Sequence, residues 1–319
     1  RAWPVRPAEV AMAVHLPDAE PIVRWTDQER WKGERSAVWS RRGEEFWNWQ
    51  ERTSDHMWNL ALRMPPWPPF GLGEWARLGG IAAAWAARDY ASSPSLSLPL
   101  DALRPVAHHL AGAPSSLRLF VDAQLLISAQ ATSTHANALY GASALDLPRR
   151  GVVHMEGGMG AIADALVNAV RSHGGRVIFR SQASRIIPQT GGSALVETAR
   201  GDAHVADFVI ANLTPWNIAR LLGDEAPRAL RTLPPRAETG WGAFVVYAGG
   251  DAGIVPADMP LHHQIVVAEP LGEANSVFLS LSPAWDASRA PAGRRAITLS
   301  THTELAPWWK LSEHDQAGY

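Results

Sequence analysis

A glycine-rich turn that opens a helix constrains the fold of this chain more than any other feature. Residues 152–180 read as a short strand, the turn Gly157-Gly158-Met159-Gly160, a helix and a second strand. A helix N-terminus presents unpaired N–H groups and the positive end of a dipole, and glycine lets a ligand approach the backbone closely. The segment is therefore typical of a nucleotide site, although a tight strand-to-helix turn would use the same residues.

The turn also matches a dinucleotide fingerprint, Gly-x-Gly-x-x-Ala, from Gly158 to Ala163, with Arg180 at the end of the next strand. This pattern is compatible with the start of an NADP-binding Rossmann domain. The strand before the turn is short and polar, however, whereas a central parallel strand is continuously apolar. Turn residues at 189–192 and 200–202 then bracket a strand at 194–198, and an apolar strand follows at 208–211. The order strand, helix, strand, hairpin, strand favours the later half of a nucleotide domain.

The composition excludes several classes of function. The 319 residues are 46% hydrophobic, which is enough for a substantial core, and the net charge of −2 gives no basic surface for nucleic acid. The absence of cysteine excludes disulfides and thiolate metal sites, and permits a cytoplasmic location. Adjacent histidines on a strand point to opposite faces, so the pairs His108-His109 and His262-His263 predict no metal site.

The first 150 residues have a mostly helical pattern, with predicted helices at 37–64, 71–90, 95–110, 115–130 and 132–147. Most of the 15 tryptophans lie in the first 85 residues, and they suit either a core built from indoles or a lipid-facing belt. The proline-rich bend at 65–69, which contains Trp67, and the apolar helix after it are expected to lie on a membrane surface or to line a portal for an apolar substrate. No apolar stretch is long enough to span a bilayer.

After residue 222 the pattern changes to β-structure. Runs rich in Val, Phe, Ile and Thr are separated by turn residues and predict strands at 242–247, 264–268, 276–281 and 296–301. We therefore expect an antiparallel sheet in this part of the chain.

Four segments carry a family resemblance: GGMGAIADAL, GGRVIFRSQASRII, ADFVIANLTPWNIARLLG and FLSLSPAWDASRAPAGRRAITLSTHTELAPWW. Together they resemble the flavin-dependent amine-oxidase and phytoene-desaturase superfamily, nearest its bacterial phytoene-dehydrogenase-like branch. The resemblance covers essentially the whole chain and is closest from about residue 117 onward. It implies a two-domain FAD enzyme. The N-terminal Rossmann motif and the C-terminal flavin-binding segment of that superfamily are missing from this sequence, so we expect a fragment that does not bind FAD tightly by itself.

With this resemblance, the predicted fold class is α+β. Residues 1–150 would form a helical cap or substrate region, residues 151–222 the remaining part of the FAD-binding domain, and residues 223–319 an antiparallel β-sheet substrate domain. The resemblance implies that the turn residues Gly157, Gly158, Met159 and Gly160 approach the flavin's ribityl or phosphate atoms. It places Ala183 where the backbone meets the adenine, although a valine is common there, and Asn212 where the chain passes close to the cofactor.

A substrate cavity is expected on the helices upstream of the glycine turn, the side from which related enzymes approach the flavin. Gln124, Gln130 and Tyr140 are its candidate lining residues, together with His302 from the β region. The alternative is that these side chains only satisfy buried backbone or cap helices. Hydride abstraction by a flavin needs no strong general base, so no catalytic residue is assigned.

The resulting hypothesis is an FAD-dependent desaturase or isomerase that acts on a long apolar isoprenoid or carotenoid by hydride transfer to flavin. Two alternatives stay open: a non-catalytic structural or carotenoid-binding subunit, which would act in a larger complex, and an NADP-dependent reductase. We expect a cytoplasmic protein with peripheral membrane contact.

Overall fold

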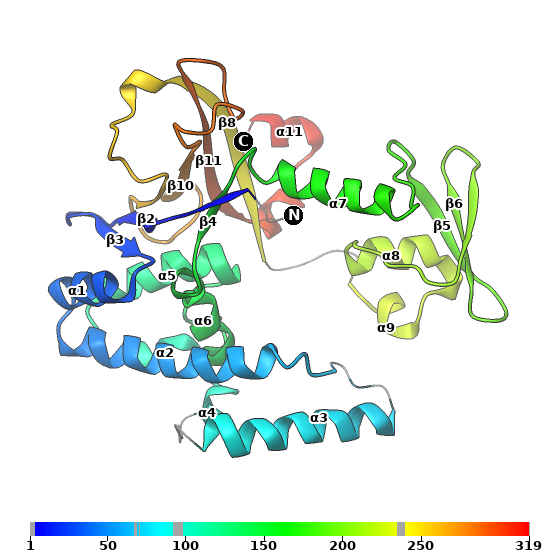
Figure 1. The fold of residues 1–319 in the computed structure, drawn as a ribbon, viewed down its shortest axis with the longest axis horizontal. Coiled ribbons are helices and arrows are strands. Elements are labelled where there is room, and N and C mark those ends of the chain that lie inside the picture. Colours follow the sequence, from blue (N-terminus) through cyan, green and yellow to red (C-terminus); the bar gives the residue numbers. More distant parts are fainter. Residues whose placement is uncertain (1–3, 67–68, 70, 92–97, 235–239, 319) are drawn as a thin grey trace. The chain divides into compact units, whose positions relative to one another are not determined.

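The computed structural model describes residues 4–66, 69, 71–91, 98–234 and 240–318. The chain divides into two compact units (Figure 1). The first unit comprises Arg1–Gly158 and Gly240–Glu304, and the second comprises Met159–Thr239 and Leu305–Tyr319. The predicted division at residues 150 and 222 is different, because it assigns the β-rich segment after residue 222 to a domain separate from the first 150 residues.

A six-stranded sheet forms the centre of the first unit. Its spatial order is β3 (Ile22–Trp25), β2 (Val10–His15), β9 (His262–Val266), β10 (Ser276–Leu281), β11 (Arg294–Glu304) and β8 (Trp241–Asp251). All neighbouring strands pair antiparallel except β2 and β9, which are parallel. The four strands predicted after residue 222 are therefore confirmed, and β10 has the predicted bounds.

The first 150 residues are less helical than predicted, because they contribute two strands to this sheet. The run Val10–His15 is short and almost wholly apolar, and periodicity alone does not distinguish such a run from a piece of buried helix. Its strand conformation depends on pairing with β9, about 250 residues later in the chain. A further short strand, β1 (Val5–Pro7), pairs antiparallel with β4 (Val153–Met155), just before the glycine turn.

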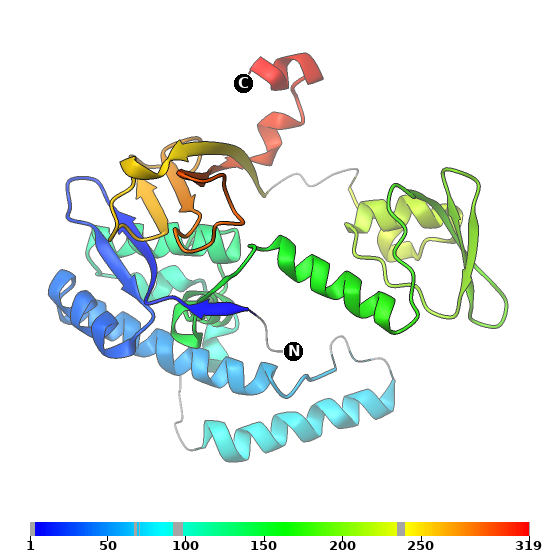
Figure 2. The ribbon, with the colours of Figure 1, turned by 45° about the horizontal axis from the view of Figure 1, so that its top comes forward.

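Helices gather on one side of the sheet (Figure 2). Four of the eight tryptophan side chains that the structure describes in the first 85 residues are buried. In Trp31, Trp39, Trp47 and Phe120 the side chains are at most 4% exposed, and the rings of Trp31 and Trp47 meet edge to face with centroids 5.2 Å apart. Such contacts suit indole rings, so this part of the chain is a core built from indoles. The helices of the first unit are α1 (Gln28–Val38), α2 (Arg41–Ala61), α3 (Leu72–Trp85), α4 (Leu98–Asp101), α5 (Ser115–Ala129) and α6 (Ala138–Leu145), with shorter turns η1 (Ala86–Tyr90), η2 (Val106–Leu110), η3 (Leu147–Arg150) and η5 (Ala252–Ile254).

Helix α3 differs from α1, α2 and α5 of the same unit because none of its described side chains is buried. Leu72 is 90% exposed and Trp75 is 58% exposed. Trp85, at the end of the helix, donates a hydrogen bond from Nε1 to the carbonyl of His56 on α2. The preceding bend contains Trp67 and Pro68, which lie outside the described residues, as does the start of the helix predicted at 95–110.

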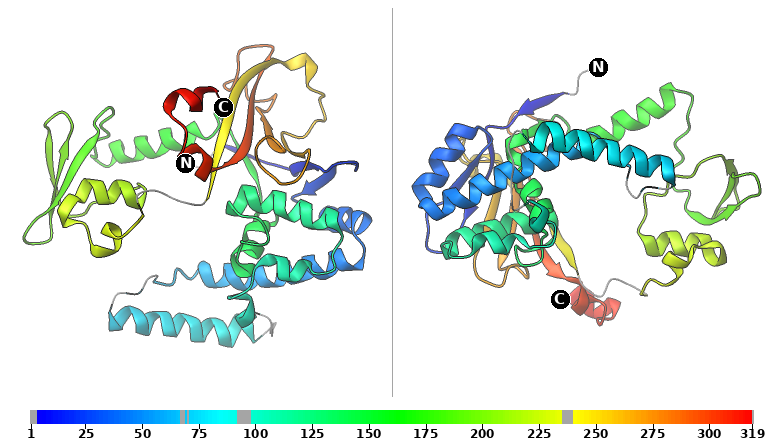
Figure 3. Two further views of the ribbon diagram at one scale, coloured as in Figure 1. Left: turned by 180° about the vertical axis from the view of Figure 1, so that it is seen from behind. Right: turned by 90° about the horizontal axis from the view of Figure 1, so that it is seen from below.

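The second unit contains α7 (Gly160–Ser172) and a three-stranded antiparallel sheet of β5 (Ala183–Pro188), β6 (Ala194–Thr198) and β7 (Ala203–Ala206) (Figure 3). Its remaining helices are α8 (Pro215–Leu222), α9 (Arg228–Arg231), α10 (Leu305–Trp308) and α11 (Glu313–Gly318), with η4 (Gly223–Glu225). The predicted hairpin is present, but residues 176–180 and 208–211 are not strands. No described strand pairs with these segments, and Phe208 and Ile210 are more than 90% exposed. An apolar run becomes a strand only where a neighbour supplies hydrogen bonds.

Candidate functional site

An apolar cavity of about 210 Å³ lies in the first unit between the sheet and the helices that cover it. Three adjacent strands, β2, β9 and β10, form one wall, and α5, α6 and η3 form the other. Most of the lining side chains are apolar: Ala11, Met12, Ile127, Ala144, Leu145, Leu147, Pro148, Val152 and Phe278. The polar ones are Gln124, Ser128 and His262. Such a chamber, apolar with a few polar groups, is the usual form of a small-molecule site.

His262 brings an imidazole into this cavity. Cross-strand pairing sets it opposite Ser280, and His262 Nδ1 lies 2.6 Å from Ser280 Oγ. Its ring stacks on Phe278, two residues from Ser280 on the same strand, with centroids 5.9 Å apart. Burial, followed by the charges of His154 and His263, lowers the pKa of His262 to about 4. The imidazole is therefore neutral at physiological pH and adds hydrogen-bonding capacity without a charge.

His263 points away from His262, as expected for neighbours on a strand. Its Nε2 donates to the carbonyl of Pro260 at 2.8 Å, so its Nδ1 accepts the hydrogen bond from His15 Nε2 at 3.0 Å. This pair is part of the packing of β2 against β9 and does not line the cavity. Among the described residues, no group of three or more His, Asp or Glu side chains is arranged to hold a metal ion.

Gln124 is a predicted cavity residue that does line the cavity, from α5, and its side chain is only 8% exposed. The amide Nε2 lies 2.9 Å from Met12 Sδ on β2, so helix and sheet meet at this contact. Ser128, one turn further along α5, donates its hydroxyl to the backbone carbonyl of Gln124. A thioether is a weak acceptor, so the Gln124 amide has unused hydrogen-bonding capacity.

The other predicted cavity residues lie outside this chamber. Gln130 follows the end of α5 in a left-handed conformation (φ 54°), and its Nε2 is 3.4 Å from His302 Nε2. His302 lies on β11, where its ring meets Trp241 edge to face, and burial lowers the pKa of this histidine. Tyr140 is on α6 but is 58% exposed. Periodicity identified the correct helices, whereas the direction of each side chain depends on how those helices pack.

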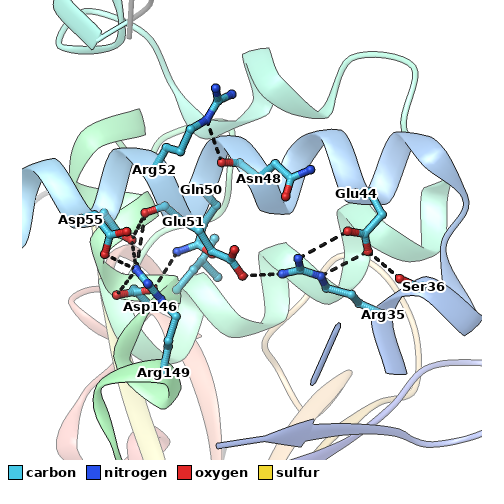
Figure 4. A network of polar contacts seen from close by, with 12 residues as sticks. Arg35, Ser36, Glu44, Asn48, Gln50, Glu51, Arg52, Asp55, Asp146 and Arg149 are labelled. Atoms are coloured by element: carbon cyan, nitrogen blue, oxygen red, sulfur yellow. Dashed lines mark hydrogen bonds and ion pairs between the residues drawn. The ribbon is translucent and has the colours of Figure 1, made fainter. Parts of the chain in front are cut away.

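A charged network joins α2 to the segment between α6 and η3 (Figure 4). Asp146, between α6 and η3, is 1% exposed and accepts hydrogen bonds from Arg149 at 2.6 Å and from Arg150 at 2.8 Å. Both arginines also reach Asp55 on α2. Against the opposing effect of burial, the hydrogen bonds to Asp146 and Asp55 raise the pKa of Arg149. The network fastens η3, which carries the lining residues Leu147 and Pro148, to α2.

Two residues of the glycine turn, Gly157 and Gly158, already donate their N–H groups to acceptors within the protein. Gly157 and Gly158 have φ of 77° and 74°, a region that glycine adopts readily. The N–H of Gly157 donates to Asp286 Oδ2, and the N–H of Gly158 donates to the carbonyl of Met155. A Cβ on Gly158 would lie 2.6 Å from the guanidinium of Arg289. The N–H groups of these two glycines are thus already hydrogen-bonded within the protein, and the guanidinium of Arg289 lies beside Gly158.

The remaining predicted cofactor residues belong to the second unit. Met159 and Gly160 stand at the start of α7, where, among the described residues, no partner accepts their N–H groups, and open space surrounds Gly160. This helix end fits an anionic group. Ala183 begins β5, and Asn212 is exposed in the segment before α8.

The pairing around the turn contradicts the Rossmann-start alternative. A Rossmann domain begins with parallel strands joined by the helix. Here β4, before α7, pairs antiparallel with β1, and β5, after α7, pairs antiparallel with β6.

Within the part of the chain that the structure describes, no helix has the length and apolar character needed to cross a membrane.

The chain is similar to curated plant proteins. Prolycopene isomerase 2, chloroplastic, of an Oncidium hybrid cultivar is 25% identical over 205 residues, which cover 61% of this chain and 34% of that protein. Prolycopene isomerase of Arabidopsis thaliana is 25% identical over 198 residues, covering 59% of this chain and 33% of the relative. The chain thus spans about a third of the length of these relatives. No protein-family profile matches the chain.

Among solved structures, the fold is similar to that of a putrescine oxidase triple mutant with redesigned cofactor binding. The TM-score is 0.55 at 11% identity, and the match covers 98% of this chain and 62% of the oxidase. At this identity the likeness concerns the fold alone. Together, the two comparisons confirm the resemblance identified from the four sequence segments.

Proposed function

We propose that this chain, a relative of the prolycopene isomerases in the flavin-dependent amine-oxidase and phytoene-desaturase superfamily, acts on a long apolar isoprenoid or carotenoid as part of an FAD-dependent desaturase or isomerase. The observation that carries the proposal is the apolar cavity between the sheet and α5, α6 and η3. Its walls offer dispersion contacts along a hydrocarbon chain and exclude water from it.

The chain's own residues bind and orient the substrate. Phe278 and Ile127 contribute apolar surface from opposite walls of the cavity, and the neutral His262 places no charge beside a hydrocarbon. FAD, when bound, supplies the acceptor for a hydride removed from the substrate. Met159, Gly160, Ala183 and Asn212 are the residues proposed to hold it. No general base is required at the cavity.

The exposed helix α3 supports peripheral membrane contact. An apolar substrate resides in lipid, and Leu72 and Trp75 present an apolar surface of the kind that interfacial helices bury in the headgroup region. We place α3 on the membrane and propose that substrate enters from there.

A non-catalytic carotenoid-binding role is the second candidate, and the engaged glycine turn favours it. The N–H groups of Gly157 and Gly158 already donate to Asp286 and Met155, so neither is free for a cofactor's phosphate. One measurement distinguishes the two functions. In it, the chain is mixed with excess FAD and a poly-cis carotene in the absence of oxygen. Loss of flavin absorbance or a change in the carotene's isomer composition supports the enzyme. An unchanged but protein-bound carotene, at an FAD concentration where quenching of flavin fluorescence shows that FAD is bound, supports the binding role and contradicts the enzyme.

A further inference from the structure

The cavity contains two polar groups that a pure hydrocarbon would leave unpaired. In the described part of the chain, no hydrogen-bond partner reaches Gln124 Oε1 or His262 Nε2. Both side chains line the cavity. A polar group that is desolvated by a ligand without receiving a partner lowers the affinity for that ligand.

The two groups belong to one corner of the cavity. The parallel register pairs Ala13 with His263, so Met12 lies beside His262 on the neighbouring strand. Met12 Sδ in turn is 2.9 Å from Gln124 Nε2. Met12 therefore connects the amide on α5 to the imidazole on β9, and both can face the same end of a ligand.

The size of the cavity indicates which part of a ligand is bound there. Its volume of about 210 Å³ is below the range of roughly 300–1,000 Å³ that is usual for sites enclosing a drug-sized molecule. A long isoprenoid therefore places only one end in the chamber, and that end meets Gln124 and His262.

We infer that the ligand's inner end carries a hydroxyl group, so that the preferred substrate class is an oxygenated isoprenoid and not a plain hydrocarbon. This inference rests on the proposed function of the cavity. A hydroxyl can donate its one proton to Gln124 Oε1 and accept a hydrogen bond from His262 Nε2. Both bonds form in the tautomer in which His262 Nε2 carries the proton and Nδ1 accepts from the Ser280 hydroxyl. The apolar walls contact the rest of the chain.

The test compares phytol with phytane, an isoprenoid alcohol and its hydrocarbon counterpart, in equilibrium binding to the full chain. We expect phytol to bind roughly tenfold more tightly, the discrimination that one buried hydrogen-bonded group commonly gives. In Gln124→Leu, which keeps the side-chain size, and in His262→Leu, this preference is expected to shrink toward one, with phytane binding retained. The control Tyr140→Phe removes a hydroxyl from α6 outside the cavity and should leave the preference unchanged.

Equal binding of phytol and phytane to the wild-type chain would overturn the inference while leaving the apolar site intact. Binding of neither compound would contradict the proposed function of the cavity itself. If one variant fails to fold, the wild-type ratio and the other variant still decide the question. A phytol preference that persists in both variants would also overturn the assignment of Gln124 and His262.

Discussion

The backbone N–H of Gly157 donates a hydrogen bond of 2.8 Å to Asp286 Oδ2, which joins the glycine turn to the loop between β10 and β11. The Ser288 hydroxyl, with the N–H groups of Gly157 and Ser288, holds the pKa of Asp286 below its usual value, against the opposing effect of burial. Arg289 from the same loop lies against Gly158. The turn is thereby part of the packing of the first unit before any ligand is considered.

Substitution of Gly158 tests this packing. Gly158→Ala is expected to lower the free energy of unfolding by about 1–2 kcal/mol, because an alanine at φ 74° is strained and the end of the Arg289 side chain must move away from the new Cβ. Gly151→Ala is the matched control, since Gly151 also has a positive φ but open space around it, and should cost about 1 kcal/mol. Arg289→Ala should rescue part of the loss in Gly158→Ala and none in Gly151→Ala. Equal losses in the two glycine variants would contradict the close contact.

The buried carboxylate of Asp146 is expected to be essential for the wall of the cavity. Asp146→Ala leaves the Arg149 and Arg150 guanidiniums with Asp55 alone, and because both arginines are partly exposed the loss should be about 2–3 kcal/mol. Glu45→Ala breaks exposed pairs with Arg41 and Arg42 on α2 and should change the free energy of unfolding by less than about 1 kcal/mol. Chemical denaturation measures both variants. A similar small effect for the two would show that the network does not hold η3.

The neutral His262 predicts a loss of stability in acid. At pH values above 6.5 the side chain is neutral in the folded and unfolded states alike, whereas between 6.5 and about 4 the unfolded chain binds a proton that the folded chain excludes. The free energy of unfolding therefore decreases as the pH is lowered through this window, by at most ~3 kcal/mol for this residue. His262→Phe should flatten the pH dependence of unfolding. An unchanged slope would mean that His262 is protonated in the folded state.

Membrane contact through α3 is tested by flotation with liposomes. Trp75→Glu places a charge on the exposed apolar surface of α3 and should reduce the fraction of protein that floats. Tyr247→Glu changes an aromatic side chain that is 81% exposed on β8, away from α3, and should float like the wild type. If both variants float equally well, α3 is not the contact.

The local sequence pattern was sufficient to predict those helices and strands whose conformation depends mainly on their own residues. The bounds of strand β10 were predicted correctly because its apolar run, which contains Val and Phe, is bracketed by turn residues. Strand β2 was missed because a six-residue apolar run has no decisive period and needs β9 as a partner. Residues 208–211 illustrate the opposite case, since their pattern suits a strand but none of the described strands pairs with them.

The candidate site was predictable only in part for the same reason. Gln124 stood out as a polar residue on an amphipathic helix, and it lines the cavity. His262 could not be distinguished from His263, because the two neighbours point to opposite faces and only the register with β10 and β2 decides which one enters the cavity. The Asp286–Gly157 contact joins residues 129 positions apart, and no local signal indicates it.

The most direct test of the central claim, that the cavity of the first unit holds one end of the isoprenoid chain, is the binding of lycopene to Ala144→Phe. Ala144 lines the cavity and is 9% exposed, so a phenyl group there occupies the space of the ligand. We predict that the wild type and the exposed control Ala229→Phe bind lycopene with a shift in its absorption spectrum, and that Ala144→Phe, with its fold verified by circular dichroism, binds at least about tenfold more weakly. Wild-type affinity in Ala144→Phe would contradict the account.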